Sequence, residues 1–97
     1  MVLEIAELTA AEGKADALAA GLRQALPVIL SAQGCLSAEA RRCLEDSDRF
    51  VLVIHWATVE DHVVTFRQGP LFKEYRSHIN GLFVEPIVAR HYELVAD

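Results

Sequence analysis

The sequence offers four histidines, one tryptophan and two tyrosines as side chains that could transfer protons or bind an aromatic ring. His62 follows Thr58 and Asp61, at a position that predicts the first turn of a helix. The positive end of the helix dipole would lower the pKa of an imidazole there and keep it neutral. A neutral imidazole can act as a general base, so His62 is the first candidate catalytic residue. A histidine on the solvated surface of the helix is the alternative interpretation.

Trp56 is the second candidate catalytic residue, because its indole could line a pocket and donate an N–H group to a ligand. The alternative role is that of a large core anchor. Phe66, Phe72 and Tyr75 recur at helical spacing after Trp56 and are candidate substrate-binding residues. Such a stripe is typical of a helix packed on a core. It could also form a pocket wall where the helix is interrupted at Gly69-Pro70.

Arg67 and Tyr92 complete the candidate substrate-binding set. Arg67 could bind an acidic group of a ligand or pair with a carboxylate on the surface. Tyr92, like Tyr75, could orient a ligand through its phenolic hydroxyl. Tyr92 and His91 are neighbours on a predicted strand and so point to opposite faces, which means that at most one of them can reach a given pocket.

These side chains require elements that position them, and the sequence predicts six in the order β-α-β-β-α-β. The predicted strands are 2–8, 35–45, 49–56 and 84–95, and the predicted helices are 13–34 and 58–79. Pro27 should kink or split the first helix, and Gly69-Pro70 should divide the second. With right-handed crossovers this order predicts one α+β domain over residues 1–97. Its fold would be ferredoxin-like, with a four-stranded antiparallel sheet and both helices on one face.

The third predicted strand is apolar on both faces. Phe50, Leu52 and Ile54 share one face with Trp56, and Val51, Val53 and His55 point to the other. Two helices can cover only one side of the sheet, and leaving several valine-sized side chains in water would forfeit roughly 1.5–3 kcal/mol each. We therefore expect a homodimer, in which a second copy of the sheet covers the open face.

Composition limits the partners and the cofactors. The net charge is −5 and the only adjacent basic pair is Arg41-Arg42, so we expect neither nucleic acid nor an anionic membrane surface as a partner. Cys35 and Cys43 do not form a CxxC motif or a His/Cys cluster, and we expect no metal and no cofactor. The start of the sequence lacks the features of a signal peptide, so we expect a cytoplasmic protein.

Five short stretches together resemble the antibiotic biosynthesis monooxygenase family: 33–36, 46–52, 56–62, 66–72, and Pro86 with His91-Tyr92. The resemblance implies a dimeric α+β barrel built from two ferredoxin-like halves. It also implies oxidation of polyphenolic or quinol substrates by O₂ without flavin, haem or metal. The haem-degrading branch uses an asparagine on the first strand and a histidine ten residues after the tryptophan. This chain has no asparagine in 2–8 and has Phe66 at the latter position, which disfavours haem degradation.

The first hypothesis is therefore a cofactor-independent monooxygenase that acts on a small aromatic or quinol-type molecule. His62 would generate the electron-rich anion that reacts with O₂, in an apolar pocket between the sheet and the second helix. The second hypothesis is a dimeric, non-catalytic protein that binds a small hydrophobic molecule. Haem binding or degradation is the third and least favoured.

Overall fold

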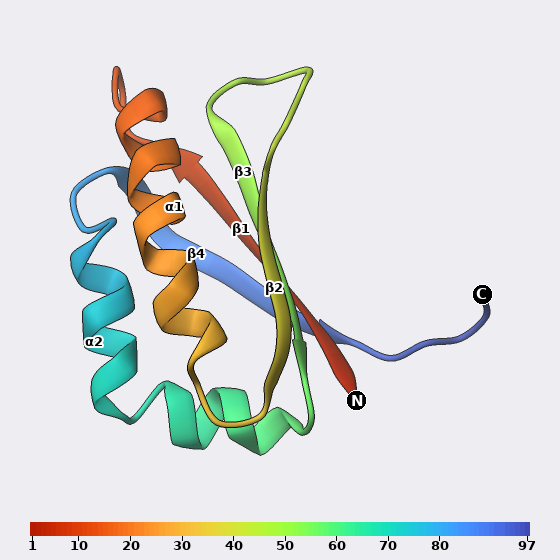
Figure 1. The fold of residues 1–97 in the computed structure, drawn as a ribbon. Helices are drawn as coiled ribbons and strands as arrows, with labels where there is room; N and C mark the ends of the chain where they lie inside the picture. Colours follow the sequence, from red (N-terminus) through yellow and green to blue (C-terminus); the bar gives the residue numbers. More distant parts are fainter.

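A computed structural model describes all residues from 1 to 97. It contains one antiparallel four-stranded sheet in the order β2-β3-β1-β4. Both helices lie on the same side of this sheet (Figure 1). The elements are β1 (Val2–Ala10), α1 (Ala15–Leu30), β2 (Cys35–Arg42), β3 (Arg49–Trp56), the π-helical segment η1 (Asp61–Phe66), α2 (Pro70–Ser77) and β4 (Phe83–Tyr92). The predicted β-α-β-β-α-β ferredoxin-like fold is confirmed.

The alternation predicted for β3 is also confirmed. Phe50, Leu52, Ile54 and Trp56 face the helices and are at most 4% exposed, while the valines between them remain only half-buried. On the helix side the core is closed by apolar side chains of α1 and of the segment after α2, among them Leu18, Leu22, Ile29 and Ile79. Trp56 is completely buried at the end of β3 nearest η1.

The sequence predicted a kink or a split of the first helix at Pro27, and the helix is not split there. Pro27 lies inside α1, and the helix continues to Leu30. A proline removes one N–H group and disturbs the carbonyl four residues earlier. Here the helix has only three residues left to run, so few further hydrogen bonds depend on that turn. Ser31 then caps the end, because its Oγ donates to the carbonyl of Val28 at 2.7 Å.

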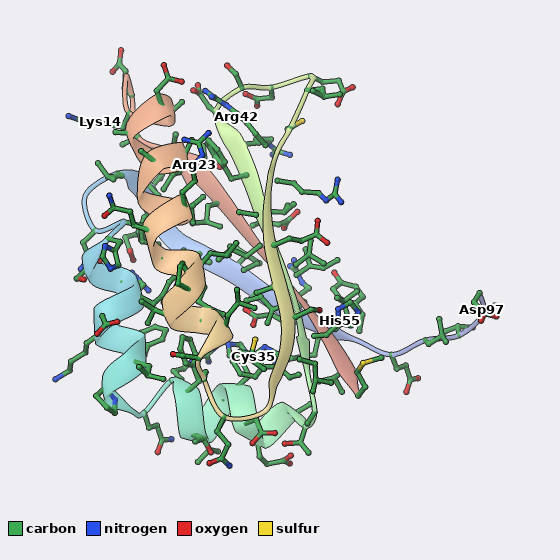
Figure 2. All side chains as sticks on the ribbon, viewed as in Figure 1. Lys14, Arg23, Cys35, Arg42, His55 and Asp97 are labelled. Atoms are coloured by element: carbon green, nitrogen blue, oxygen red, sulfur yellow. The ribbon has the colours of Figure 1, made fainter.

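The sheet face opposite the helices is uncovered (Figure 1). Leu3 and Ile5 of β1 and Val51 and Val53 of β3 lie on it, each partly exposed. Figure 2 shows His55 on this same side of the sheet. We call the sheet face opposite the helices the open sheet face.

No helix is both long and apolar enough to cross a membrane.

The turn between β3 and η1 is fastened to the start of β2. Gly34 has a φ of +80°, and its carbonyl accepts a hydrogen bond from the N–H of Ala57 at 2.7 Å. A Cβ at Gly34 would collide with the side chain of Asp61, coming within 2.7 Å of the aspartate Cβ. Thr58 caps the helical turn that leads into η1, since its Oγ1 accepts the N–H of Asp61 at 3.1 Å. Gly34 thus allows the close approach that places η1 against the sheet.

We predict that Gly34→Ala destabilises the protein by at least about 2 kcal/mol, from left-handed backbone strain plus the collision with Asp61. Gly81→Ala is the matched control, because Gly81 has a φ of +82° but nothing within 4 Å of an added Cβ. That variant should lose only about 1 kcal/mol, the backbone contribution. Urea unfolding of both variants measures the difference, and equal losses would contradict the proposed contact.

Candidate functional site

A cavity of about 310 Å³ lies between the helix-facing side of the sheet and the elements η1 and α2. Nine of its fifteen lining residues are hydrophobic, and its polar lining includes both acidic and basic side chains. Its titratable or charged residues are Glu4, His62, Arg67, Tyr75, Arg76 and Glu85. The size suits a small aromatic molecule, and the mixture of an apolar wall with a few polar groups is typical of a ligand site.

A larger hollow of about 420 Å³ is lined by residues of all four strands, including three arginines of β2 and β3: Arg41, Arg42 and Arg49. Its arginines pair with surface acids: Arg49 with Asp46 at 3.6 Å, and Arg42 with Asp16 at 3.0 Å. None of the site residues predicted from the sequence lines it. The smaller cavity, which holds buried titratable groups, is therefore the better candidate for chemistry.

Glu4 is the central polar group of the cavity and was not among the site residues predicted from the sequence. It lies on the helix-facing side of β1 and is only 4% exposed. Its Oε1 accepts a hydrogen bond from the indole N–H of Trp56 at 2.8 Å. Burial raises the pKa of this carboxyl above its ordinary value, although the hydrogen bond from Trp56 and the charge of Arg67 act in the opposite direction.

His62 faces Glu4 from η1 and is 3% exposed. Its Nε2 lies 3.4 Å from Oε1 of Glu4, and its ring stacks on the indole of Trp56 with centroids 5.2 Å apart and planes at 16°. Its Nδ1 lies within hydrogen-bond distance of Nε2 of His91, at 2.8 Å. His62 is therefore not a solvated surface residue but is packed between three elements of the fold.

The pKa of His62 is lowered from 6.5 to about 4. Burial is the largest cause, followed by the positive charge of Arg67 and the neighbouring His91. Arg67 Nη2 lies 3.5 Å from Nε2 of His62. The imidazole is consequently neutral at physiological pH, as predicted from the sequence. The main cause is burial and not the helix dipole.

The π-helical geometry of η1 aims His62 and Phe66 inward together. The N–H of Arg67 bonds the carbonyl of His62, five residues earlier, at 3.0 Å. This wide turn places His62 and Phe66 on one side, both buried and both beside Trp56. Segments of π-helix are frequent at functional sites because they redirect side chains in this way.

Three of the predicted substrate-binding residues form the aromatic wall. Phe66, Phe72 and Tyr75 contact one another with ring centroids 5.7–5.9 Å apart, and all three line the cavity. Burial raises the pKa of Tyr75 to about 12, so its hydroxyl keeps its proton and can donate a hydrogen bond. The break at Gly69-Pro70 between η1 and α2 is the interruption that the sequence predicted.

Arg76 also lines the cavity, beside the predicted Arg67. Its Nη2 bonds Glu85 at 2.9 Å, and its guanidinium lies over the rings of Phe72 and Phe83. Its Nε–H is buried without a hydrogen-bond partner. No group of three or more His, Cys, Asp or Glu side chains is placed to hold a metal ion.

Comparison with known proteins identifies the fold and its family. The sequence model described as "Antibiotic biosynthesis monooxygenase" matches residues 1–77. The chain belongs to this family. A crystal structure from Bordetella bronchiseptica, described as a candidate antibiotic biosynthesis monooxygenase, is 35% identical, with a TM-score of 0.92 over 98% of this chain and 97% of that one.

Two further proteins are similar to the chain at lower identity. A structure from Nitrosomonas europaea is 18% identical with a TM-score of 0.81, covering 99% of this chain and 100% of that one, and shows the fold alone. The uncharacterized protein YczJ of Bacillus subtilis is 27% identical over 93 residues, which is 96% of this chain and 98% of that protein.

In this member of the family, Tyr92 does not lie at the cavity, contrary to the sequence prediction. In the register of β4 on β1, Tyr92 pairs with Leu3 and His91 pairs with Glu4. Tyr92 therefore points to the open sheet face, where it is 46% exposed, and His91 points inward to His62. Strand alternation predicts that only one of these two side chains reaches the cavity, and the register of β4 on β1 shows that it is His91.

We predict that His62 stays neutral down to about pH 4, so its Cε1–H NMR signal should titrate there and well below the ordinary midpoint near 6.5. The unfolded chain then binds a proton at His62 before the folded one does. Acidification from pH 6.5 towards 4 should therefore remove stability through His62, while Glu4, whose folded pKa is raised, contributes in the opposite direction. The contribution of His62 is the difference between the pH dependences of the wild type and His62→Gln, and His78→Gln, outside the cavity, should match the wild type. A midpoint near 6.5 in the folded protein would contradict the buried, neutral state.

Proposed function

We propose that this protein is a cofactor-independent monooxygenase for a small aromatic or quinol-type compound bound in the cavity between the sheet, η1 and α2. Family membership supports a monooxygenase-like role in general. The observation that carries the finer proposal is a neutral, buried imidazole at the wall of an aromatic cavity. His62 can accept a proton from a phenolic hydroxyl, which is the step that makes such a ring reactive towards O₂.

The surroundings of His62 support this chemistry on the substrate side. Phe66, Phe72 and Tyr75 provide aromatic surface on which a ring can pack. Arg67 lies beside the imidazole and carries a positive charge, which would stabilise the oxygen anion formed on deprotonation. The apolar wall would exclude water from the anion, so that the charge is stabilised mainly by these fixed groups.

The anion is the electron donor in this proposal. It would transfer one electron to O₂, and the two radicals would combine to form a carbon–oxygen bond. One oxygen atom of O₂ would remain on the ring as a carbonyl and the other would leave as water. For a phenol this converts one ring C–H and the hydroxyl into a quinone, with one O₂ consumed and one water released.

We predict O₂ consumption when the wild-type protein is mixed with hydroquinones or anthrones, measured with an oxygen electrode. His62→Gln should reduce kcat/KM by a factor of about 10²–10⁴, the usual contribution of a general base. His78→Gln, at the end of α2, should behave as wild type. Saturable ligand binding without O₂ consumption would instead identify a non-catalytic binding protein.

We also propose that the open sheet face pairs with a second copy of this chain. The support is the row of half-buried apolar side chains from β1 and β3, which no helix covers. Val88 and Tyr92 of β4 add exposed apolar surface to the same face. Pairing with an identical face would remove this surface from water in a two-fold arrangement.

We predict that light scattering on the purified protein gives about twice the monomer mass of 10.7 kDa. Val53→Asp, at the centre of the open sheet face, should shift the mass to that of a monomer because it would bury unpaired carboxylates. Val64→Asp is the matched control, since Val64 is 48% exposed on η1 and is not part of the sheet. A monomeric wild type, or an unchanged dimer in Val53→Asp, would rule out this interface.

A further inference from the structure

We propose that Glu4 is the acid partner of His62: Glu4 supplies the proton that converts the bound peroxide into a hydroperoxide, and His62 then returns a proton to Glu4. The inference rests on the proposed function and adds a second catalytic residue to it. Glu4 and His62 are the two polar or charged residues that are buried in this chain. They project from β1 and η1 into the same cavity.

The geometry allows direct proton exchange between the two side chains. Nε2 of His62 and Oε1 of Glu4 are 3.4 Å apart, close enough for a proton to pass after a small rotation of either group. Trp56 holds both partners in place, because its N–H bonds the carboxyl oxygen while its ring stacks on the imidazole. Both groups line the cavity, so each can also reach a bound molecule.

Burial shifts the pKa values of the two groups in opposite directions. It disfavours the charged form of each group, which raises the pKa of Glu4 and lowers that of His62 to about 4. The other charged or titratable groups facing the pair are Arg67 and His91, the cavity residues Tyr75, Arg76 and Glu85, and Cys35, which interacts electrostatically with Glu4. Arg67 partly opposes the effect on Glu4 and adds to the effect on His62. When this pair holds one proton, burial therefore favours that proton on Glu4, beside a neutral His62.

Over one reaction cycle, Glu4 and His62 return to their starting protonation states. His62 takes the hydroxyl proton of the phenol, and Glu4 gives its proton to the terminal oxygen of the ring-bound peroxide. The hydroperoxide then loses the hydrogen on the same carbon as a proton. Its O–O bond breaks to leave a carbonyl, and the departing hydroxide takes up that proton to form water. At this point His62 is protonated and Glu4 is ionised, and transfer from Nε2 to Oε1 restores the starting state.

A purely structural role for Glu4 explains less. The indole N–H of Trp56 needs an acceptor, but any neutral carbonyl or amide would satisfy it without the penalty of burying an ionisable group. Glutamine has the same shape and would keep that hydrogen bond. The variant Glu4→Gln therefore separates the proton of Glu4 from its function as an acceptor for Trp56.

Infrared difference spectroscopy on the whole protein tests the protonation state without any substrate. At pH 7 the wild type should show the carbonyl stretch of one protonated carboxylic acid, which disappears at higher pH. The band should be absent from Glu4→Gln and present in Glu12→Gln, the control at an exposed residue of the turn after β1. Should Glu4→Gln not fold, Glu4→Asp keeps the acid and should shift the same band. Absence of the band from the wild type at pH 7 would overturn the proposal.

Product analysis tests the step itself. With an anthrone that the wild type oxidises, Glu4→Gln should still consume O₂. It should release the ring hydroperoxide in place of anthraquinone and water, so that quinone formed per O₂ falls at least tenfold, and Glu12→Gln, at an exposed turn residue, should keep the wild-type ratio. An unchanged ratio in Glu4→Gln would overturn the acid role while leaving the monooxygenase proposal intact. If the wild type consumes no O₂ with any such compound, both proposals fail together.

Discussion

The buried indole of Trp56 is the constraint on which the rest of the site depends. Its ring fills the end of the core and is completely excluded from water, so its N–H must find an acceptor inside the protein. Glu4 provides that acceptor from the neighbouring strand β1, and the stacked ring of His62 closes the other side. A hydrophobic anchor therefore holds two ionisable groups in the interior. The packing of the tryptophan thus keeps both ionisable groups away from water.

Much of this arrangement could be predicted from strand alternation. Phe50, Leu52 and Ile54 reveal which face of β3 carries Trp56, and that face lies under the helices. Glu4 could not be assigned in the same way. In β1 both Glu4 and Glu7 interrupt an apolar run, and only the pairing with β3 shows that the first points inward and the second outward. An inward glutamate contradicts the usual hydrophobic pattern, and such local conflicts are frequent at functional sites.

The end of β4 shows why one residue of register decides the composition of a site. The sequence places His91 and Tyr92 on opposite faces but cannot tell which face is which, because β4 carries no clear alternation of its own. The ladder to β1 is irregular between Glu7 and Thr9: Glu7 pairs with Val88 but Thr9 pairs with Val84, so the register changes by two residues and the alternation of faces is kept. In the observed register His91 lies opposite Glu4 and reaches His62. The contact of His91 with His62 is thus set by long-range strand pairing, which local sequence does not encode.

Burial reverses the usual order of acid and base in this pair. In water a histidine holds its proton more tightly than a glutamic acid. In the cavity the low dielectric penalises both ions, so the carboxyl becomes the proton carrier and the imidazole the acceptor. The ion pair formed after one proton leaves Glu4 and another arrives on His62 is therefore a high-energy state. Its two members stand 3.4 Å apart, and proton return between them relieves both penalties at once. The packing that buries Trp56 would in this way also drive the site back to its resting state.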